Sequence, residues 1–173
     1  MAASIDKDLE WVIVDGNMEQ NPLEKIEYYL QSGDFFIFGC TVMPGPQLKQ
    51  AIPITKHIHQ KYPQVKIVWG GYFPSNQPET VMNSGYVDFV FNGMADLGFP
   101  LLLKKIINND PDYTDVPNLI YKEDKALKGW IKKKSMVFSP DELPSLPYEK
   151  LNSFYPIKNY LGKTYLGSKT IAY

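Results

Sequence analysis

The chain has 173 residues, 44% of them hydrophobic, and a formal net charge of −1. This length suits one sizeable core, and the near-neutral charge argues against a dominant nucleic-acid or anionic-membrane surface. No apolar run approaches the roughly 20 residues that cross a bilayer, and no signal-peptide pattern is visible, so we expect a cytoplasmic protein without a membrane span. Cys40 is the only cysteine, which excludes a disulfide framework and a cysteine cluster for zinc or iron–sulfur.

Four short runs rich in Val, Ile and Phe are typical of buried strands. They cover residues 10–17, 34–41, 65–71 and 87–93. Apolar residues at helical spacing follow each run and predict helices over residues 21–33, 44–63, 77–85 and 97–110. Pro53 lies inside the second helix, where the lost backbone N–H predicts a kink.

Strands that alternate with helices indicate a mostly parallel sheet with right-handed crossovers and helices on both faces. In such a sheet, ligands bind outside the carboxyl ends of the strands, which share one edge. Three of the strand ends carry glycine, in "GCTVMPGPQ", "WGGYFPS" and "FNGMADLG". Because glycine lets a large planar ligand approach the backbone, the three together favour a binding rim over simple turns.

The same segments occur in a specific order and spacing: "FGCTVMPGPQLKQAI", "KYPQVKIVWGGYFPSNQPETVM", "VDFVFNGMAD", "PNLIYKEDK" and "DELPSLPYEKL". Together they resemble the cobalamin-binding domain at the N-terminus of many radical S-adenosylmethionine (SAM) enzymes, over about residues 10–155. The resemblance implies a flavodoxin-like domain that holds the corrin ring against the carboxyl edge of the sheet, with the nucleotide tail running down between strands.

The resemblance also implies a set of cofactor-binding residues, with no catalytic and no metal-ligating residue. A corrin is broad and apolar with peripheral amides, which suits bare glycine backbone, apolar side chains and a few hydroxyl or amide partners. We therefore expect Gly71→Val to block ligand uptake with less effect on folding. The implied residues are Thr41, Val42, Met43, Gly45, Pro46 and Gln47, then Gly70, Gly71, Tyr72, Phe73 and Pro74, and finally Asn92, Gly93, Met94 and Asp96.

The chain departs from the family pattern in two places. Where the family has "GEGE", this sequence reads "NGMAD", so Asn92 replaces the first acid and Asp96 supplies the nearby carboxylate. The family's opening strand is also absent, because "MAASIDKDLEWVIVDGN" resembles the end of the first helix and then the second strand. That strand would be central in a flavodoxin-like sheet, so we expect an N-terminally incomplete domain with exposed strand edges and marginal stability.

We expect the α/β domain to span residues 1–112, and a β-hairpin with a proline-rich connector to span residues 113–173. The predicted hairpin turns at "EDKA", and Lys132, Lys133 and Lys134 on its second arm favour a solvated edge over a phosphate site. The segment "SPDELPSLPYEKLNSFYPIKNYLG" indicates an ordered linker that docks on another surface. In the family, this connector leads into the radical SAM barrel, which holds S-adenosylmethionine and a 4Fe–4S cluster.

The resemblance therefore implies a cobalamin-binding module of a radical SAM enzyme, of methyltransferase type, that is not catalytic without the barrel as its partner. A second hypothesis stays open: a non-enzymatic binding or interaction module on a flavodoxin-like scaffold that has lost cobalamin binding. The absent strand and "NGMAD" favour this second hypothesis.

Other chemistries find less support in the sequence. His57 and His59 lie two residues apart on a predicted helix, so their side chains diverge by about 200° and are expected at the surface rather than on a shared ligand. Cys40, at the tip of a predicted buried strand, is expected to be a small core residue. Asp15 lacks the second acid and the lysine of a phosphoacceptor receiver, and no nucleophile elbow, P-loop or dinucleotide fingerprint is present.

Overall fold

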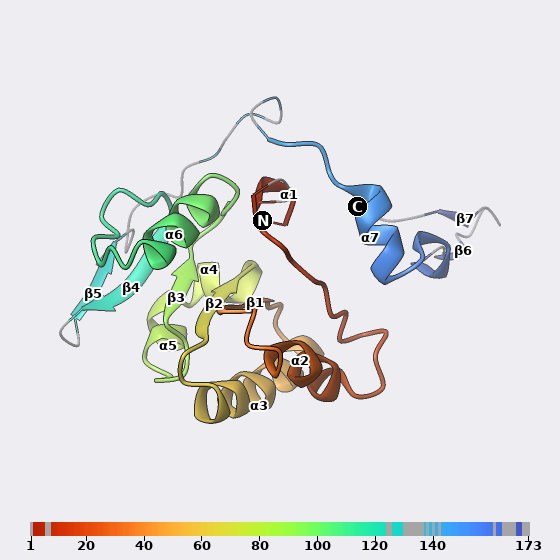
Figure 1. Cartoon of the computed structure of the whole chain (residues 1–173), viewed down its shortest axis with the longest axis horizontal. Coiled ribbons are helices and arrows are strands. Elements are labelled where there is room, and N and C mark those ends of the chain that lie inside the picture. The colour runs from red at the N-terminus through yellow and green to blue at the C-terminus, as the bar shows by residue number, and fades with distance from the viewer. Residues whose placement is uncertain are drawn as a thin grey trace.

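One five-stranded sheet organises the protein in this computed structural model, which describes residues 2–5, 8–123, 126–129, 137, 139, 141, 143–160, 162–163 and 169–170 (Figure 1). The strands follow chain order across the sheet: β1 Ile37–Thr41, β2 Lys66–Gly70, β3 Phe89–Phe91, β4 Leu119–Glu123 and β5 Ala126–Gly129. β1, β2 and β3 run parallel, and β4 and β5 continue the sheet as antiparallel strands. Two further short strands, β6 Gly162–Lys163 and β7 Lys169–Thr170, pair with each other.

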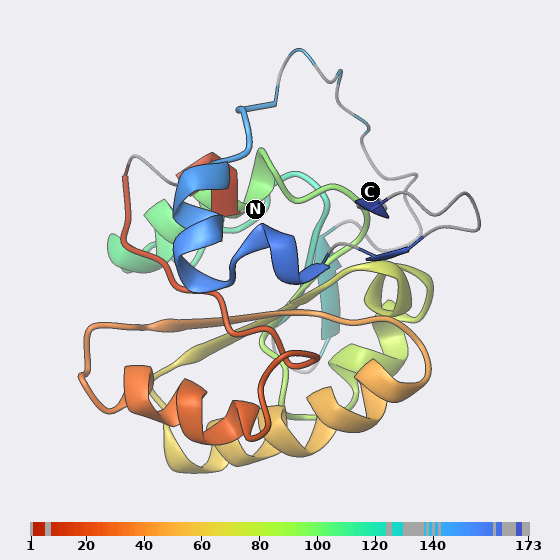
Figure 2. The same cartoon turned by 90° about the vertical axis from the view of Figure 1, so that its right-hand side faces the viewer.

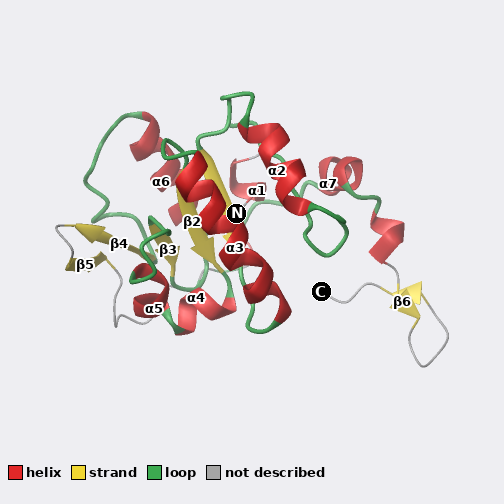
Figure 3. Cartoon of the chain, turned by 90° about the horizontal axis from the view of Figure 1, so that it is seen from below, coloured by secondary structure: helices red, strands yellow, loops and turns green. Residues whose placement is uncertain are grey.

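Helices cover both faces of the sheet. The first face packs against α2 Pro22–Leu30, α3 Pro46–Lys61 and α5 Pro78–Met82, and Figure 3 shows α2 and α3 lying over it. The other face packs against α1 Ala2–Ile5, α6 Gly98–Ile107 and α7 Tyr148–Phe154. A short helix, α4 Tyr72–Asn76, follows β2, and a 3₁₀ turn, η2 Ile157–Tyr160, follows α7. The predicted three-layer α/β arrangement is confirmed.

The two faces have separate apolar cores because side chains alternate along each strand. Ile67 and Trp69 of β2 point toward α3 and α5, and the Trp69 indole N–H donates to the buried Thr55 hydroxyl at 3.1 Å. Val68 of the same strand points to the opposite core, where it joins Phe91 and the α6 residues. This alternation confirms that β2 is a buried central strand.

The four predicted helices occur as α2, α3, α5 and α6, each within three residues of its predicted bounds, whereas α4 lies in a segment that the sequence predicted as a rim loop. Asn21 caps α2, because its side-chain oxygen accepts from the Glu24 backbone N–H at 3.4 Å, and Pro22 occupies the first turn. α3 continues through Pro53 as a single element. α6 ends with Lys104 and Lys105 in its last turn, the position that the helix dipole favours.

The strand predicted over residues 10–17 is wrong. Residues 10–15 run as an irregular connection and residues 16–18 form a turn, and no ladder joins this segment to the sheet. Its apolar residues are instead covered by the C-terminal connector, since the Trp11 and Phe154 rings lie 5.5 Å apart and the Lys150 ammonium lies 4.2 Å from the Trp11 ring. Only Trp11 of this segment is buried, residues 12–16 are half-buried, and no backbone hydrogen bond joins residues 12–14 to β1. Figures 1 and 2 show it passing between the sheet and α7.

The predicted hairpin is confirmed, with Glu123 paired to Ala126 across its turn. β4 pairs with β3, so the hairpin extends the main sheet. The three lysines at positions 132–134 lie outside the described residues. Among the residues that the structure describes, no helix is long and apolar enough to span a membrane.

Candidate functional site

The segments after β1, β2 and β3 meet at the carboxyl edge of the sheet. We call residues 41–47, 70–75 and 92–96 the rim, which includes the start of α3 and most of α4. Backbone hydrogen bonds join the first two. The Val42 N–H donates to the Gly70 carbonyl at 2.9 Å, and the Phe73 N–H donates to the Val42 carbonyl at 3.1 Å. The first two loops therefore form one continuous backbone surface rather than independent turns.

Ser75 joins the second loop to the third. Its hydroxyl donates to the Gly71 carbonyl at 2.8 Å and accepts from the Gly93 N–H at 2.9 Å. Ser75 is missing from the residues predicted from sequence, although the serine of "GGYFPS" was the available signal.

Asn118, a fully buried residue that precedes β4, supports the third loop from below. Its side-chain amide donates to the Met94 carbonyl at 2.7 Å, and its own carbonyl accepts from the Asn92 N–H at 2.8 Å. Asn118 adopts a left-handed backbone with φ of 60°, which asparagine tolerates better than most residues. It lies about 25 residues beyond the loop that it supports, so no local pattern in the sequence indicates this role.

The predicted rim residues divide into exposed and buried side chains. Met43 and Tyr72 are exposed by 44% and 60%, which places two large apolar surfaces at the rim. The side chain of Val42 is fully buried, so this residue presents only its backbone at the rim. Pro74 is buried as well, and Phe73 packs against the core below the sheet. Of the remaining predicted residues, the exposed ones are Thr41, Gly45, Pro46 and Gly93, and the half-buried ones are Gln47, Gly71, Asn92, Met94 and Asp96.

The two adjacent glycines have different roles. Gly71 has φ of 93°, and a Cβ there would lie 3.0 Å from Thr41 Cγ2 and 3.1 Å from the Val42 nitrogen. The expectation that Gly71→Val spares the fold is therefore wrong, because this glycine permits close contact between two loops. A Cβ added at Gly70 would meet no atom within 4 Å and would project into open space. Gly70 itself is buried at the end of β2, and an added Cβ there would not meet the neighbouring loop.

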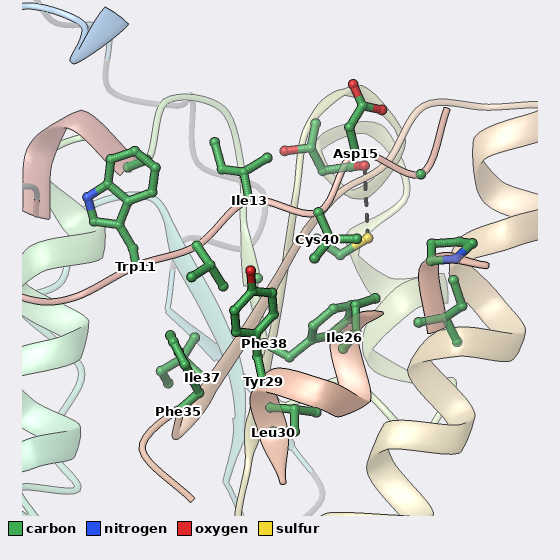
Figure 4. A pocket seen from close by; sticks show the side chains of 18 of the residues that line it. Trp11, Ile13, Asp15, Ile26, Tyr29, Leu30, Phe35, Ile37, Phe38 and Cys40 are labelled. Carbon is green, nitrogen blue, oxygen red and sulfur yellow. Dashed lines mark hydrogen bonds between the residues drawn. The ribbon is translucent and has the colours of Figure 1, made fainter. Parts of the chain in front are cut away.

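A cavity of the described part of the chain lies beside the rim rather than under all three loops. It has a volume of about 910 Å³ and is bounded by residues 9–17 on one side and β1 on the other (Figure 4). Thr41 and Gln47 are the predicted site residues that line it. Gln47 also closes its own loop, because its side-chain oxygen accepts from the Met43 N–H at 3.1 Å.

Cys40 lies in β1 with its side chain packed against the core on the α3 side. Burial raises the pKa of the Cys40 thiol to about 12, which keeps the thiol protonated near neutral pH. The Cys40 side chain is half-buried and also lines the cavity beside β1, so the expectation of a core cysteine is met only in part.

The two histidines have no role at the rim. The His57 Nε2 lies 2.8 Å from Glu27 Oε1, which ties α3 to α2, while His59 is exposed. Hydrogen bonds from Lys61 and His57 lower the pKa of Glu27 to about 2. The expectation that both histidines are surface helix residues is confirmed. Within the described parts of the chain, no group of three or more His, Cys, Asp or Glu side chains could hold a metal ion.

Comparison with known proteins finds similar enzymes among the curated proteins and among the solved structures. No family model matches the sequence. The cobalamin-dependent radical SAM methyltransferase TokK of Streptomyces tokunonensis is 25% identical over 99 residues, which cover 57% of this chain and 14% of TokK. The cobalamin-dependent S-adenosylmethionine radical enzyme OxsB, with aqua-cobalamin bound, matches with a TM-score of 0.61 at 20% identity over 76% of this chain and 18% of OxsB. Apo OxsB matches over the same shares with a TM-score of 0.60 at 18% identity.

The chain spans less than a fifth of the length of TokK or OxsB. The mixed sheet with three parallel strands, covered by helices on both faces, is the arrangement that matches OxsB. The resemblance read from the sequence is confirmed: this chain is similar in sequence and in fold to part of the cobalamin-dependent radical SAM enzymes.

Proposed function

We propose that this chain binds cobalamin at the rim, with the corrin lying over the carboxyl edge of the sheet. The observation that carries this proposal is the joining of three glycine-bearing loops into one surface by Val42, Phe73 and Ser75. A flat, rigid ligand needs a rim that is already formed, because ordering three separate loops on binding would cost conformational entropy. The similarity to TokK and OxsB supports the same ligand.

The rim has the side chains that a corrin would need. Met43 and Tyr72 offer exposed apolar surface to the face of the ring. The Thr41 hydroxyl and the Asn92 amide are suited to the peripheral amides of the cofactor, and the Gly70 backbone leaves space for its edge. The remaining rim residues named from the sequence contribute backbone or hold the loops in place.

When bound, cobalamin supplies a cobalt centre that can carry a methyl group. The residues of this chain would bind and orient the cofactor and exclude water from one face of it. We further propose that the chain works beside a radical SAM barrel that binds S-adenosylmethionine and a 4Fe–4S cluster, with methyl transfer as the reaction class that TokK favours.

Retention of hydroxocobalamin tests the cofactor proposal. The purified chain is mixed with hydroxocobalamin and desalted, its visible spectrum is recorded, and circular dichroism verifies the fold. We expect retained corrin absorbance in the wild type and its loss in Gly70→Leu, because the new side chain would fill the open space next to this rim glycine.

An exposed tyrosine elsewhere supplies a matched control. Tyr72→Ala should weaken retention, whereas Tyr28→Ala, which removes a tyrosine with 73% exposure on α2, should leave it unchanged. A folded wild-type sample that retains no corrin would overturn the proposal and favour the interaction-module hypothesis. Equal retention in Gly70→Leu and in the wild type would place the cofactor away from the rim.

A further inference from the structure

The cavity beside β1 has an unusual set of walls. Its two long sides are residues 34–41, which include β1, and the irregular residues 10–15 (Figure 4). Helices above and below the sheet supply its other walls with mostly apolar side chains, joined by Gln47 and Gln50 of α3. Ile26 and Leu30 of α2, with Ile54 of α3, close one face, and Phe99 and Leu103 of α6 close the opposite face. The cavity therefore lies in the plane of the sheet, between two helical layers.

β1 forms one long side of the cavity, and the edge of β1 that faces the cavity pairs with no other described strand. The Phe36 carbonyl accepts from the Lys66 N–H, and the Val42 N–H donates to the Gly70 carbonyl, each at 2.9 Å. Because the backbone groups of successive strand residues point to opposite edges, those of Ile37, Gly39 and Thr41 point away from β2. They face the cavity, where a further strand would find both donors and acceptors.

Residues 10–15 form the other long side of the cavity and do not pair with this edge of β1. No backbone hydrogen bond joins residues 12–14 to β1, although both segments are described. The C-terminal connector fixes the outer segment instead. The Tyr155 hydroxyl accepts from the Asp15 N–H at 3.1 Å, and the Tyr160 hydroxyl donates to Asp15 Oδ2 at 2.6 Å. These contacts anchor residues 10–15 from outside and leave the space beside β1 open.

An extended peptide is the ligand that matches these walls. The free backbone edge can pair with hydrogen-bonding groups that lie in the plane of the sheet. The apolar helix surfaces above and below can pack against apolar side chains on both faces of the ligand. A central strand of a parallel sheet has both features. Gly39 adds room, because a Cβ there would meet no atom within 4 Å. A compact small molecule would leave the edge groups of Ile37, Gly39 and Thr41 without partners.

We propose that this cavity binds one extended, apolar peptide strand that pairs with the free edge of β1. The strand is about five to six residues long, as is typical of globular proteins, and is rich in Val, Ile and Leu on both faces. This inference does not depend on cobalamin binding at the rim. Since the cavity ends at Thr41 and Gln47, the bound strand would end beside the first rim loop.

Residue-resolved amide hydrogen exchange on the full chain, without cobalamin, tests the proposal. The probe is the synthetic peptide Ac-KVIVLVIK-NH2, and the matched control is Ac-KVIPLVIK-NH2, in which proline removes one backbone donor. At a free peptide concentration of about ten times its Kd, exchange at Ile37, Gly39 and Thr41 should slow roughly tenfold, because exchange then requires the unbound state. The Phe38 and Cys40 amides face β2 and should change little.

Two variants of the chain test whether the peptide binds in this cavity. Gly39→Leu should prevent the protection by filling the cavity, and Tyr28→Ala should leave it intact. If Gly39→Leu does not fold, the proline peptide supplies the same comparison on the wild type, where it should protect the edge amides far less.

Four results would overturn the proposal: edge amides that are already protected in the free chain, no protection by the peptide, equal protection by both peptides, or protection of the same amides by hydroxocobalamin alone. The last would make the cavity a cofactor site. Loss of cobalamin retention at the rim with intact peptide protection would instead overturn the proposed function and leave this inference standing.

Discussion

β1 and β2 are neighbouring parallel strands with the same length and similarly apolar sequences, yet they differ in burial. Four of the five β2 residues are buried, whereas β1 has only half-buried and exposed residues. β2 has a strand on each side, while β1 has one neighbour and a cavity. Burial of a strand in this protein thus depends on its neighbours as much as on its own residues.

Matched isoleucine substitutions test this difference most strongly. Ile67→Ala in β2 removes a fully buried side chain and should lower the free energy of unfolding by about 2–5 kcal/mol. Ile37→Ala in β1 removes a half-buried side chain next to an open space and should cost less than half as much. Urea unfolding followed by circular dichroism measures both, and equal losses would show that β1 is buried in solution.

Matched glycine substitutions test the same two strands at the backbone. Gly71→Val, just after β2, forces a β-branched residue to a φ of 93° against Val42 and should cost at least about 1–3 kcal/mol. Gly39→Val in β1 meets no atom within 4 Å and should be neutral or stabilising, because valine favours strands. Thermal unfolding of both variants is the measurement. A Gly71→Val protein as stable as the wild type would contradict the close loop contact.

The contrast also explains what the sequence could predict. Residues 65–71 and 87–93 are apolar runs that sit between strand neighbours, and their prediction as strands is confirmed by β2 and β3. Residues 10–17 have an equally apolar pattern but no partner, and the strand prediction is wrong there. Only Trp11 of residues 10–17 is buried, so an apolar pattern alone predicts neither full burial nor a ladder. A ladder needs a second strand, which one segment cannot reveal.

The rim also contains residues whose roles the sequence could not predict. Glycine positions predicted that three loops share one edge, because the geometry of a parallel sheet guarantees it. The connecting side chains, Ser75 and Asn118, could not be ranked from the sequence, because their partners are backbone groups of loops distant along the chain. Asp96 and Asn92 remain predictions as cofactor contacts.

The C-terminal connector offers a smaller test, aimed at the outer wall of the cavity. The Tyr155 hydroxyl donates to Glu19 Oε1 at 2.6 Å and accepts from Lys25 Nζ at 3.2 Å and from the Asp15 N–H. Tyr155→Phe should therefore lower the free energy of unfolding by about 1 kcal/mol and expose residues 10–19 to proteolysis. Tyr28→Phe is the control, because the Tyr28 ring is 73% exposed. Unchanged proteolysis in Tyr155→Phe would show that the connector does not hold this segment in solution.

The smallest expected effect concerns the helices that cover the β1 side of the sheet and depends on pH. Glu27 of α2 accepts from Lys61 and His57 of α3, and these partners lower its pKa from 4.5 to about 2. A carboxyl with a lowered folded-state pKa stabilises the fold above its unfolded pKa, and this contribution is lost as the pH falls from about 4.5 to about 2. Glu27→Gln should therefore be less stable than the wild type at neutral pH, with a difference that shrinks over this acidic range. Glu24→Gln on the same helix, where Glu24 accepts from the Asn21 side-chain amide, is the matched control. Unfolding midpoints of the wild type and the variants, measured across this pH range, test the prediction. A stability difference between the wild type and Glu27→Gln that stays constant with pH would mean that the ion pairs do not hold α2 against α3.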